Sequence, residues 1–163
     1  MSLRYKFNTA ATLTRNLPPQ GEAALGRICD RIRSAQRRLN RDAAPLMAAC
    51  GQRCRGLCCR NIAADDIITL VDCIFVWSVG DEALRHRITG CLPSESLFTA
   101  DCLFLADGRG PCIFPDDAKP LKCIVTFCGD ETPVRASIQQ LRGRFRRLFW
   151  HLAMRRPSLL LVM

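Results

Sequence analysis

The clearest pattern along the chain is an amphipathic helix that follows Pro18-Pro19. Apolar residues recur there at alternating intervals of three and four, and the arginines fall mostly off that stripe, so the spacing predicts a helix of about five turns. Pro45 limits its continuation. Before it, residues 3–7 alternate apolar and basic side chains, which predicts a short half-buried strand. The apolar stripe of the helix is Leu25, Ile28, Ile32, Ala35 and Leu39.

A second helix is predicted from Asp65-Asp66, whose carboxylates suit a helix N-terminus, to Gly80. Its body is apolar on nearly every face, so it belongs in the core, and it is too short to span a bilayer. No other apolar run reaches the length of about 18 residues that a transmembrane helix needs. A shorter helix is expected to follow Asp81 and to end at Gly90.

The last helix has Thr132 as its predicted N-cap and Pro133 at its first position, and it runs to Pro157. We expect its stripe and that of the first long helix to pack on the central helix, although homodimerisation or a protein partner through either stripe stays open. The stripe consists of Val134, Ile138, Leu141, Phe145, Leu148 and Leu152.

These elements predict a mainly α fold with short β elements, in which cysteine-rich metal-binding loops pack on helices. The length of 163 residues corresponds to a single domain, 1–163. Within it we distinguish an N-terminal strand and arginine-rich helix (1–48), a cysteine-cluster core (50–128) and a C-terminal arginine-rich helix (131–157).

The formal net charge of +9 is unevenly distributed. Residues 1–60 carry twelve basic and three acidic side chains, residues 61–130 five and eleven, and residues 131–163 seven and one. Twenty-one of the 24 basic residues are arginine, whose planar fork suits phosphate and carboxylate. Solvated helix faces are the simplest interpretation, while nucleic acid, an acidic partner and a membrane surface stay open.

Eleven cysteines are the main anomaly of the composition. An odd number with an adjacent pair, Cys58-Cys59, suits a disulfide framework poorly. The first fifteen residues contain no apolar segment typical of a secretory signal, so we predict the reducing cytoplasm, where dense cysteines bind metal or perform redox chemistry. Three cysteines with apolar or helical neighbours are interpreted as inert packing residues: Cys29, Cys73 and Cys91.

The remaining eight cysteines form two groups that we predict to be metal ligands. Asp107-Gly108 is predicted to form a hairpin turn between two short strands, which would bring Cys102 and Cys112 together. The predicted ligands are Cys50, Cys54, Cys58 and Cys59 in the run CGQRCRGLCC, then Cys102, Cys112, Cys123 and Cys128. Cations that flank them are expected to lower the thiol pKa values, namely Arg53, Arg55, Arg60, Arg109, Lys119 and Lys122.

Thiolates are soft ligands that select zinc, cuprous copper or iron-sulfur clusters. Structural zinc sites usually contain C-x2-C pairs, and this chain has none, although it has C-x3-C and C-x4-C pairs. An iron-sulfur cluster accommodates irregular spacing, because its inorganic core sets the distances between ligands. We therefore expect an iron-sulfur cluster, with zinc as the alternative. The eight thiols would divide into two centres or into one centre plus free thiols.

Residues 50–128 resemble the YkgJ-like CxxCxxCC cysteine-cluster family, whose members are described as zinc- or iron-chelating. The eight cysteines fall in the family's order, and Lys119-Pro120 precedes Cys123 as a Pro-x-x-Cys element. The chain departs from the family in having three residues between Cys54 and Cys58 and in having Lys119 where the family has arginine. The resemblance implies metal chelation by these eight cysteines.

Familiar catalytic motifs are missing, including the P-loop, G-x-G-x-x-G, G-x-S-x-G and H-E-x-x-H, so the sequence leaves open whether the protein is an enzyme. His86 and His151 are interpreted as surface or packing residues. Two function classes follow. The first is an iron-sulfur protein with a redox, electron-transfer or enzyme-accessory role. The second is a zinc-stabilised interaction module whose arginine-rich helices bind nucleic acid or an acidic protein.

Overall fold

The structure is a computed structural model that describes residues 1–53, 59, 62–92, 102–106, 111–127 and 129–155, with the side chains of residues 49–53 left out. These ranges contain eight α-helices and one short 3-10 helix, and their only β-structure is an isolated bridge between Leu105 and Cys112. The mainly α prediction is therefore confirmed. The helices are α1 (Leu3–Arg15), α2 (Pro19–Asp42), α3 (Ala44–Arg53), α5 (Ala64–Ile67), α6 (Leu70–Val79), α7 (Glu82–Cys91), α8 (Leu121–Val125), η2 (Thr132–Val134) and α9 (Arg135–Arg155).

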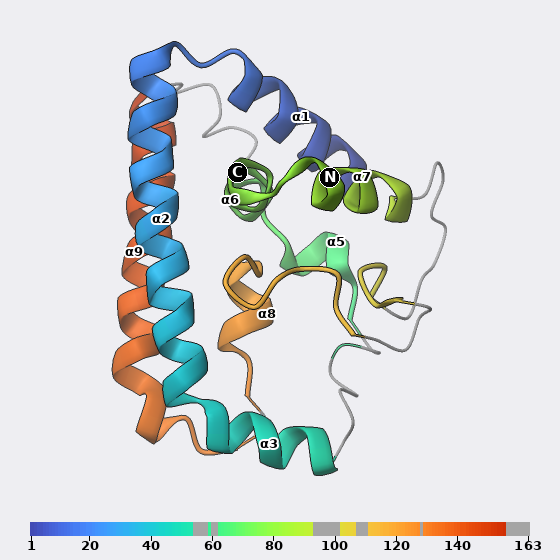
Figure 1. Cartoon of the computed structure of the whole chain (residues 1–163), viewed down its shortest axis with the longest axis vertical. Helices are drawn as coiled ribbons and strands as arrows, with labels where there is room; N and C mark the ends of the chain where they lie inside the picture. The colour runs from blue at the N-terminus through green and yellow to red at the C-terminus, as the bar shows by residue number, and fades with distance from the viewer. Residues whose placement is uncertain (54–58, 60–61, 93–101, 107–110, 128, 156–163) are drawn as a thin grey trace.

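The two long helices α2 and α9 lie antiparallel along one side of the molecule (Figure 1). The five stripe residues in α9 and Val134 in η2 are buried, and so are the stripe residues of α2 except Ile28, which is half-buried. The largest contact between described helices joins α2 and α9 directly, and α6 packs against both. The stripes thus meet each other as well as the central helix, because each stripe is wide enough to cover two neighbours.

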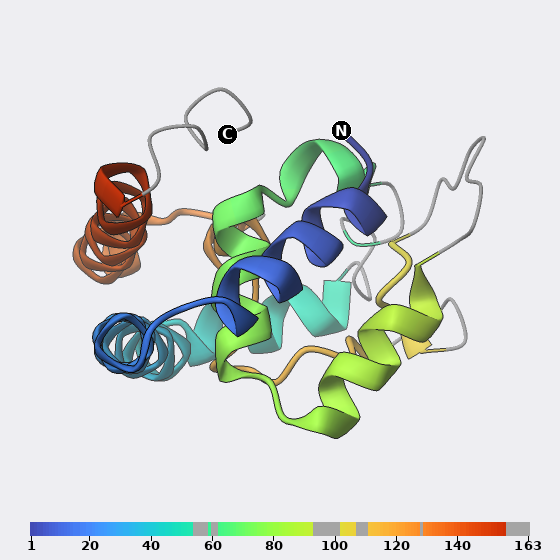
Figure 2. The ribbon, with the colours of Figure 1, turned by 90° about the horizontal axis from the view of Figure 1, so that it is seen from above.

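Helix α6 is the apolar centre of the fold, as its sequence predicts. Six of its ten residues are buried apolar side chains, and Phe75 packs edge-on against Phe145 of α9 with ring centroids 5.2 Å apart. Figure 2 shows α1 and α7 on the side of α6 away from the α2–α9 pair. Helix α6 ends at Gly80 and α7 is N-capped by Asp81, both as predicted.

The predicted start of the central helix at Asp65-Asp66 is wrong. These residues lie in the separate one-turn helix α5, and α6 begins after Thr69. Thr69 and Asp72 form a capping box: Thr69 Oγ1 accepts from Asp72 N at 3.2 Å, and Asp72 Oδ2 accepts from Thr69 N at 2.9 Å. This reciprocal pair of hydrogen bonds satisfies the backbone N–H groups of Thr69 and Asp72, so it fixes the start of α6 at this point.

The predicted strand at residues 3–7 is also wrong, because this segment opens helix α1. The buried residues Leu3, Phe7 and Ala10 recur at helical spacing, whereas Tyr5, which alternation would bury, is 52% exposed. Lys6 is buried, and its Nζ donates to the carbonyls of Asp65 and, at 2.7 Å, Ile68. The lysine therefore binds the turn between α5 and α6, which explains why a cation lies on the inner face.

Helix α9 begins close to the predicted position. The Thr132 hydroxyl donates to Asp130 Oδ1 at 2.6 Å instead of capping the helix, so the first turn is the 3-10 helix η2. The predicted stop at Pro157 lies outside the described residues. None of the helices in the described ranges combines the length and the apolar character that crossing a membrane requires.

Replacing Thr69 with alanine is expected to lower the free energy of unfolding by about 1 kcal/mol, because the N-terminus of α6 loses its cap. Urea titration of the purified chain measures this loss. Thr89→Ala is the matched control, since the Thr89 hydroxyl is exposed and donates only to the Arg85 carbonyl within α7. Equal losses in the two variants would contradict the importance of the capping box.

Candidate metal centre

Two matching tripeptides, Cys102-Leu103-Phe104 and Cys112-Ile113-Phe114, form the base of the site. In each, the N–H of the phenylalanine donates a hydrogen bond to the sulfur of the cysteine two residues earlier. The two segments run antiparallel, with Ile113 N donating to Phe104 O at 2.9 Å. The predicted Asp107-Gly108 turn lies outside the described residues, and the predicted strands reduce to a single bridge.

The phenylalanines of the two tripeptides fasten them to the core. Phe104 and Phe114 pack with ring centroids 4.6 Å apart, and Phe104 also meets Phe7 of α1 edge-on at 6.0 Å. Both rings are buried, while Cys102 and Cys112 are half-buried. Each tripeptide therefore directs its ring inward and leaves its sulfur nearer the surface.

Cys59 and Cys123 complete a group that we call the four-cysteine site, together with Cys102 and Cys112. The backbone of Cys102 donates to the carbonyl of Cys59 at 3.1 Å. Cys123 lies on α8, where burial raises the pKa of its thiol, and the negative charges of Cys102, Cys112, Asp72 and Cys59 add to that effect. Four of the eight predicted ligands thus lie near one another, although they come from segments far apart in the sequence.

The other four predicted ligands cannot be placed in this way. Cys50 lies in α3 and its side chain is not described, and Cys54, Cys58 and Cys128 fall outside the described residues. Within the described ranges, no three histidine, cysteine or acidic side chains are close enough to hold one metal ion.

Burial dominates the acidity of these thiols. It raises the pKa values of Cys102, Cys112 and Cys123, and the N–H donors of Phe104 and Phe114 offset only part of that effect. Among the described thiols of the site, the Lys119 charge lowers the pKa of Cys112, as expected of a flanking cation, but burial outweighs it. The prediction is wrong for these three thiols because desolvation of a thiolate exceeds the effect of one partly screened cation.

Helix α2 positions the segment between Cys112 and Cys123. The buried Gln36 donates through Nε2 to the Lys119 carbonyl at 2.7 Å and accepts from Lys119 N at 3.0 Å. Asn40 donates to the Asp116 carbonyl at 2.8 Å, while Arg33 and Arg37 pair with Asp117 at 3.0 and 2.8 Å. One polar face of α2 is therefore devoted to holding residues 116–119.

Asp72 positions α8 itself. Its Oδ1 accepts from Leu121 N at 2.7 Å, and its Oδ2 accepts from Thr69 at the start of α6. The carboxylate is almost completely buried, and this burial raises the pKa of Asp72 even though the hydrogen bonds act in the opposite direction. One side chain therefore joins the N-termini of α6 and α8 and sets the position of Cys123.

Sequence reasoning missed three contributors to the site. Burial is the main cause of the raised pKa of Cys102, and the charge of Cys91, a half-buried thiol at the end of α7 that was interpreted as inert, makes the smallest contribution in the same direction. No local pattern distinguishes Cys91 from a packing residue. Asp72 was detectable from the Thr-x-x-Asp capping motif, whereas Gln36 carries no signal because its partner lies 83 residues away.

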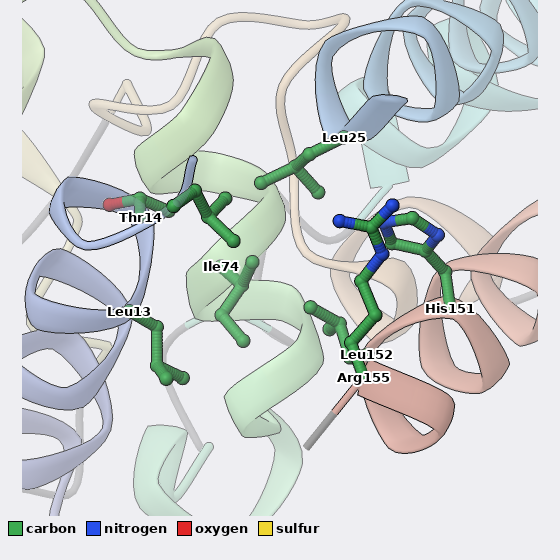
Figure 3. A pocket seen from close by; sticks show the side chains of 8 residues that line it. Leu13, Thr14, Leu25, Ile74, His151, Leu152 and Arg155 are labelled. Carbon is green, nitrogen blue, oxygen red and sulfur yellow. The ribbon is translucent and has the colours of Figure 1, made fainter. Parts of the chain in front are cut away.

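A small cavity lies away from the cysteines, between α1, α2, α6 and α9 (Figure 3). Its volume of about 30 Å³ can hold a water molecule or two but not a cofactor. Leu13, Ile74 and Leu152 line it, with His151 and Arg155 beside each other at its edge. Partial burial, followed by the charge of Arg155, lowers the pKa of His151.

Comparisons with family models, with curated proteins and with solved structures found no match to this chain. The resemblance to the YkgJ-like family therefore stays a prediction.

Replacing Gln36 with leucine is expected to destabilise the chain by about 2–3 kcal/mol, because the N–H and carbonyl of Lys119 lose their partners in a buried place. Urea titration gives the free energy of unfolding. Asn40→Leu serves as the control, since Asn40 makes a single exposed bond to the same segment, and its loss should stay within about 1 kcal/mol. If Gln36→Leu lowered the free energy of unfolding no more than Asn40→Leu does, the anchoring of Lys119 by Gln36 would be contradicted.

His151 predicts a pH dependence of stability. Because its pKa in the folded chain lies below the usual 6.5, the folded state binds fewer protons there than the unfolded state. The stability difference between the wild type and His151→Gln should be present above pH 6.5 and decline as the pH falls below it. Urea titrations across this range test the sign, with His86→Gln on α7 as a control. Parallel curves for wild type and His151→Gln would disprove it.

Proposed function

We propose that the chain is a metal-binding cysteine-cluster protein whose four-cysteine site takes part in holding an iron-sulfur cluster, in a redox, electron-transfer or enzyme-accessory role in the cytoplasm. The observation that carries the proposal is the convergence of Cys59, Cys102, Cys112 and Cys123 from three separate segments. Thiols scattered as packing residues would have no reason to meet at one place.

The chemistry of the donor set fits such a group. All four donors are thiols, which select soft metals and iron-sulfur clusters. The Phe104 and Phe114 N–H groups point at two of the sulfurs, as hydrogen bonds that stabilise thiolate ligands and tune a cluster do. The irregular spacing of the cysteines along the chain favours a multi-iron core over one zinc ion, because such a core sets the distances between its own ligands.

The half-buried position of the site supports a redox role. All four cysteines are partly exposed, so a cluster held there would lie within reach of an electron partner. The group would supply one-electron chemistry when bound. The residues of this chain would provide the ligands and would orient two of them through the backbone donors of Phe104 and Phe114.

Purification without oxygen tests the proposal directly. We expect brown protein with broad absorption near ~400 nm, together with iron and acid-labile sulfide in elemental analysis. Colourless protein with stoichiometric zinc would overturn the iron-sulfur assignment in favour of the zinc alternative. Protein with neither metal nor sulfide would overturn metal binding altogether.

Cysteine variants test which residues carry the metal. Cys59→Ser and Cys123→Ser should each lose metal and destabilise the fold, and Cys58→Ser is expected to behave in the same way. Cys29→Ser is the control: Cys29 is fully buried between α2 and α6, where burial raises its pKa to about 12 and Ser78 is its hydrogen-bond partner. Its metal content should equal that of the wild type. Equal metal retention in all variants would refute the ligand assignment.

A further inference from the structure

A groove lined by arginines runs along the outer seam between α2 and α9. It has a volume of about 370 Å³ and includes Arg31, Arg38 and Arg41 from α2 and Arg144 from α9. Asp30 is the one acidic residue among the residues that line it. We call this feature the arginine groove. A cleft lined by one sign of charge concentrates counter-ions and attracts oppositely charged ligands.

The arginines of the groove form few ion pairs within the described part of the chain. In the described part of the chain, neither Arg31, Arg41 nor Arg144 forms an ion pair. Arg38 lies 3.7 Å from Asp42, but their side chains are 59% and 39% exposed, so the pair is weak. Arg33 and Arg37, by contrast, hold Asp117. Arginines on the same helix therefore have different uses on its two faces.

We propose that the arginine groove binds the sugar-phosphate backbone of a nucleic-acid duplex, independently of its sequence. Arg31 and Arg41 are ten residues apart on one helix, a distance of about 15 Å along its axis. A duplex presents one negative charge per about 1.7 Å, or about nine charges over that length, whereas a free phosphate ion would reach only part of the row. The arginine fork suits phosphate oxygens in a bidentate manner.

The lining of the groove favours this ligand over other polyanions. Among the described residues that line it there is no aromatic side chain, so the bases of a single strand would find nothing to stack on. The one apolar lining residue is Ala35, which offers no pocket for the apolar anchor of a protein partner. A rigid backbone that needs only charge and hydrogen-bond donors fits what the groove provides.

Fluorescence anisotropy of the full chain with a labelled duplex tests the proposal. Four arginines that each neutralise one phosphate should give a slope of about −3.6 for log K against log salt. The double variant Arg31→Gln/Arg144→Gln should bind at least tenfold more weakly at low salt, and its slope should shrink by about two. No duplex binding by the wild type, or tighter binding of a single strand or of polyglutamate than of the duplex, would overturn it.

The matched control removes the same charge from another face of α9. Arg142 and Arg146 are exposed and line a different groove, beside Phe145. Arg142→Gln/Arg146→Gln should retain duplex affinity within about twofold. An equal loss in both double variants would show that net charge alone drives binding and would overturn the groove. Since no proposed metal ligand is altered, metal content should be unchanged in all variants, which separates this test from that of the iron-sulfur proposal.

Discussion

The carboxylate of Asp72 accepts hydrogen bonds from Thr69, three residues before it, and from Leu121, 49 residues after it. Burying a carboxylate is unfavourable unless its oxygens are satisfied, and here both oxygens are. The arrangement therefore depends on the two helix starts occupying their positions together. Cys123 lies two residues beyond Leu121, so the location of the four-cysteine site depends on this single buried group.

The polar residues on two faces of helix α2 have different roles. One face, with Gln36, Asn40, Arg33 and Arg37, holds the backbone and side chains of residues 116–119. The face along the α9 seam presents Arg31 and Arg41, which form no ion pair in the described structure, and Arg38, whose pair with Asp42 is exposed. The arginines of α2 thus have two roles. Some hold the segment next to the cysteine site, and the others line the arginine groove, where a ligand can reach them.

The sequence predicted most of the helices because their apolar stripes repeat over many turns. Its errors fall where the repeat is too short to distinguish periods. Five alternating residues at 3–7 could not distinguish a strand from the first turns of α1, and Asp65-Asp66 gave a helix start that the Thr69–Asp72 box supersedes. Both errors have one cause: a short segment contains too few repeats of the apolar pattern, so its side-chain contacts determine its secondary structure.

The candidate site was predictable in its residue type but not in its geometry. The spacing of the cysteines indicated Cys59, Cys102, Cys112 and Cys123, and these four lie near one another in the described structure, where no three of them are close enough to hold one metal ion. It did not indicate Cys91 or Gln36, because both act across contacts between residues distant in sequence. Whether Cys50, Cys54, Cys58 and Cys128 join the site stays a prediction.

The two Cys-x-Phe tripeptides have a consequence for how the interior can vary. The backbone N–H that reaches each sulfur belongs to the same residue whose ring is packed in the interior, so a shift of the ring moves the donor. Under the proposed function, the electrochemical potential of the bound group would respond to substitutions at Phe7, whose ring packs against that of Phe104. Evolution of the hydrophobic interior and tuning of electron affinity would then be coupled in this protein.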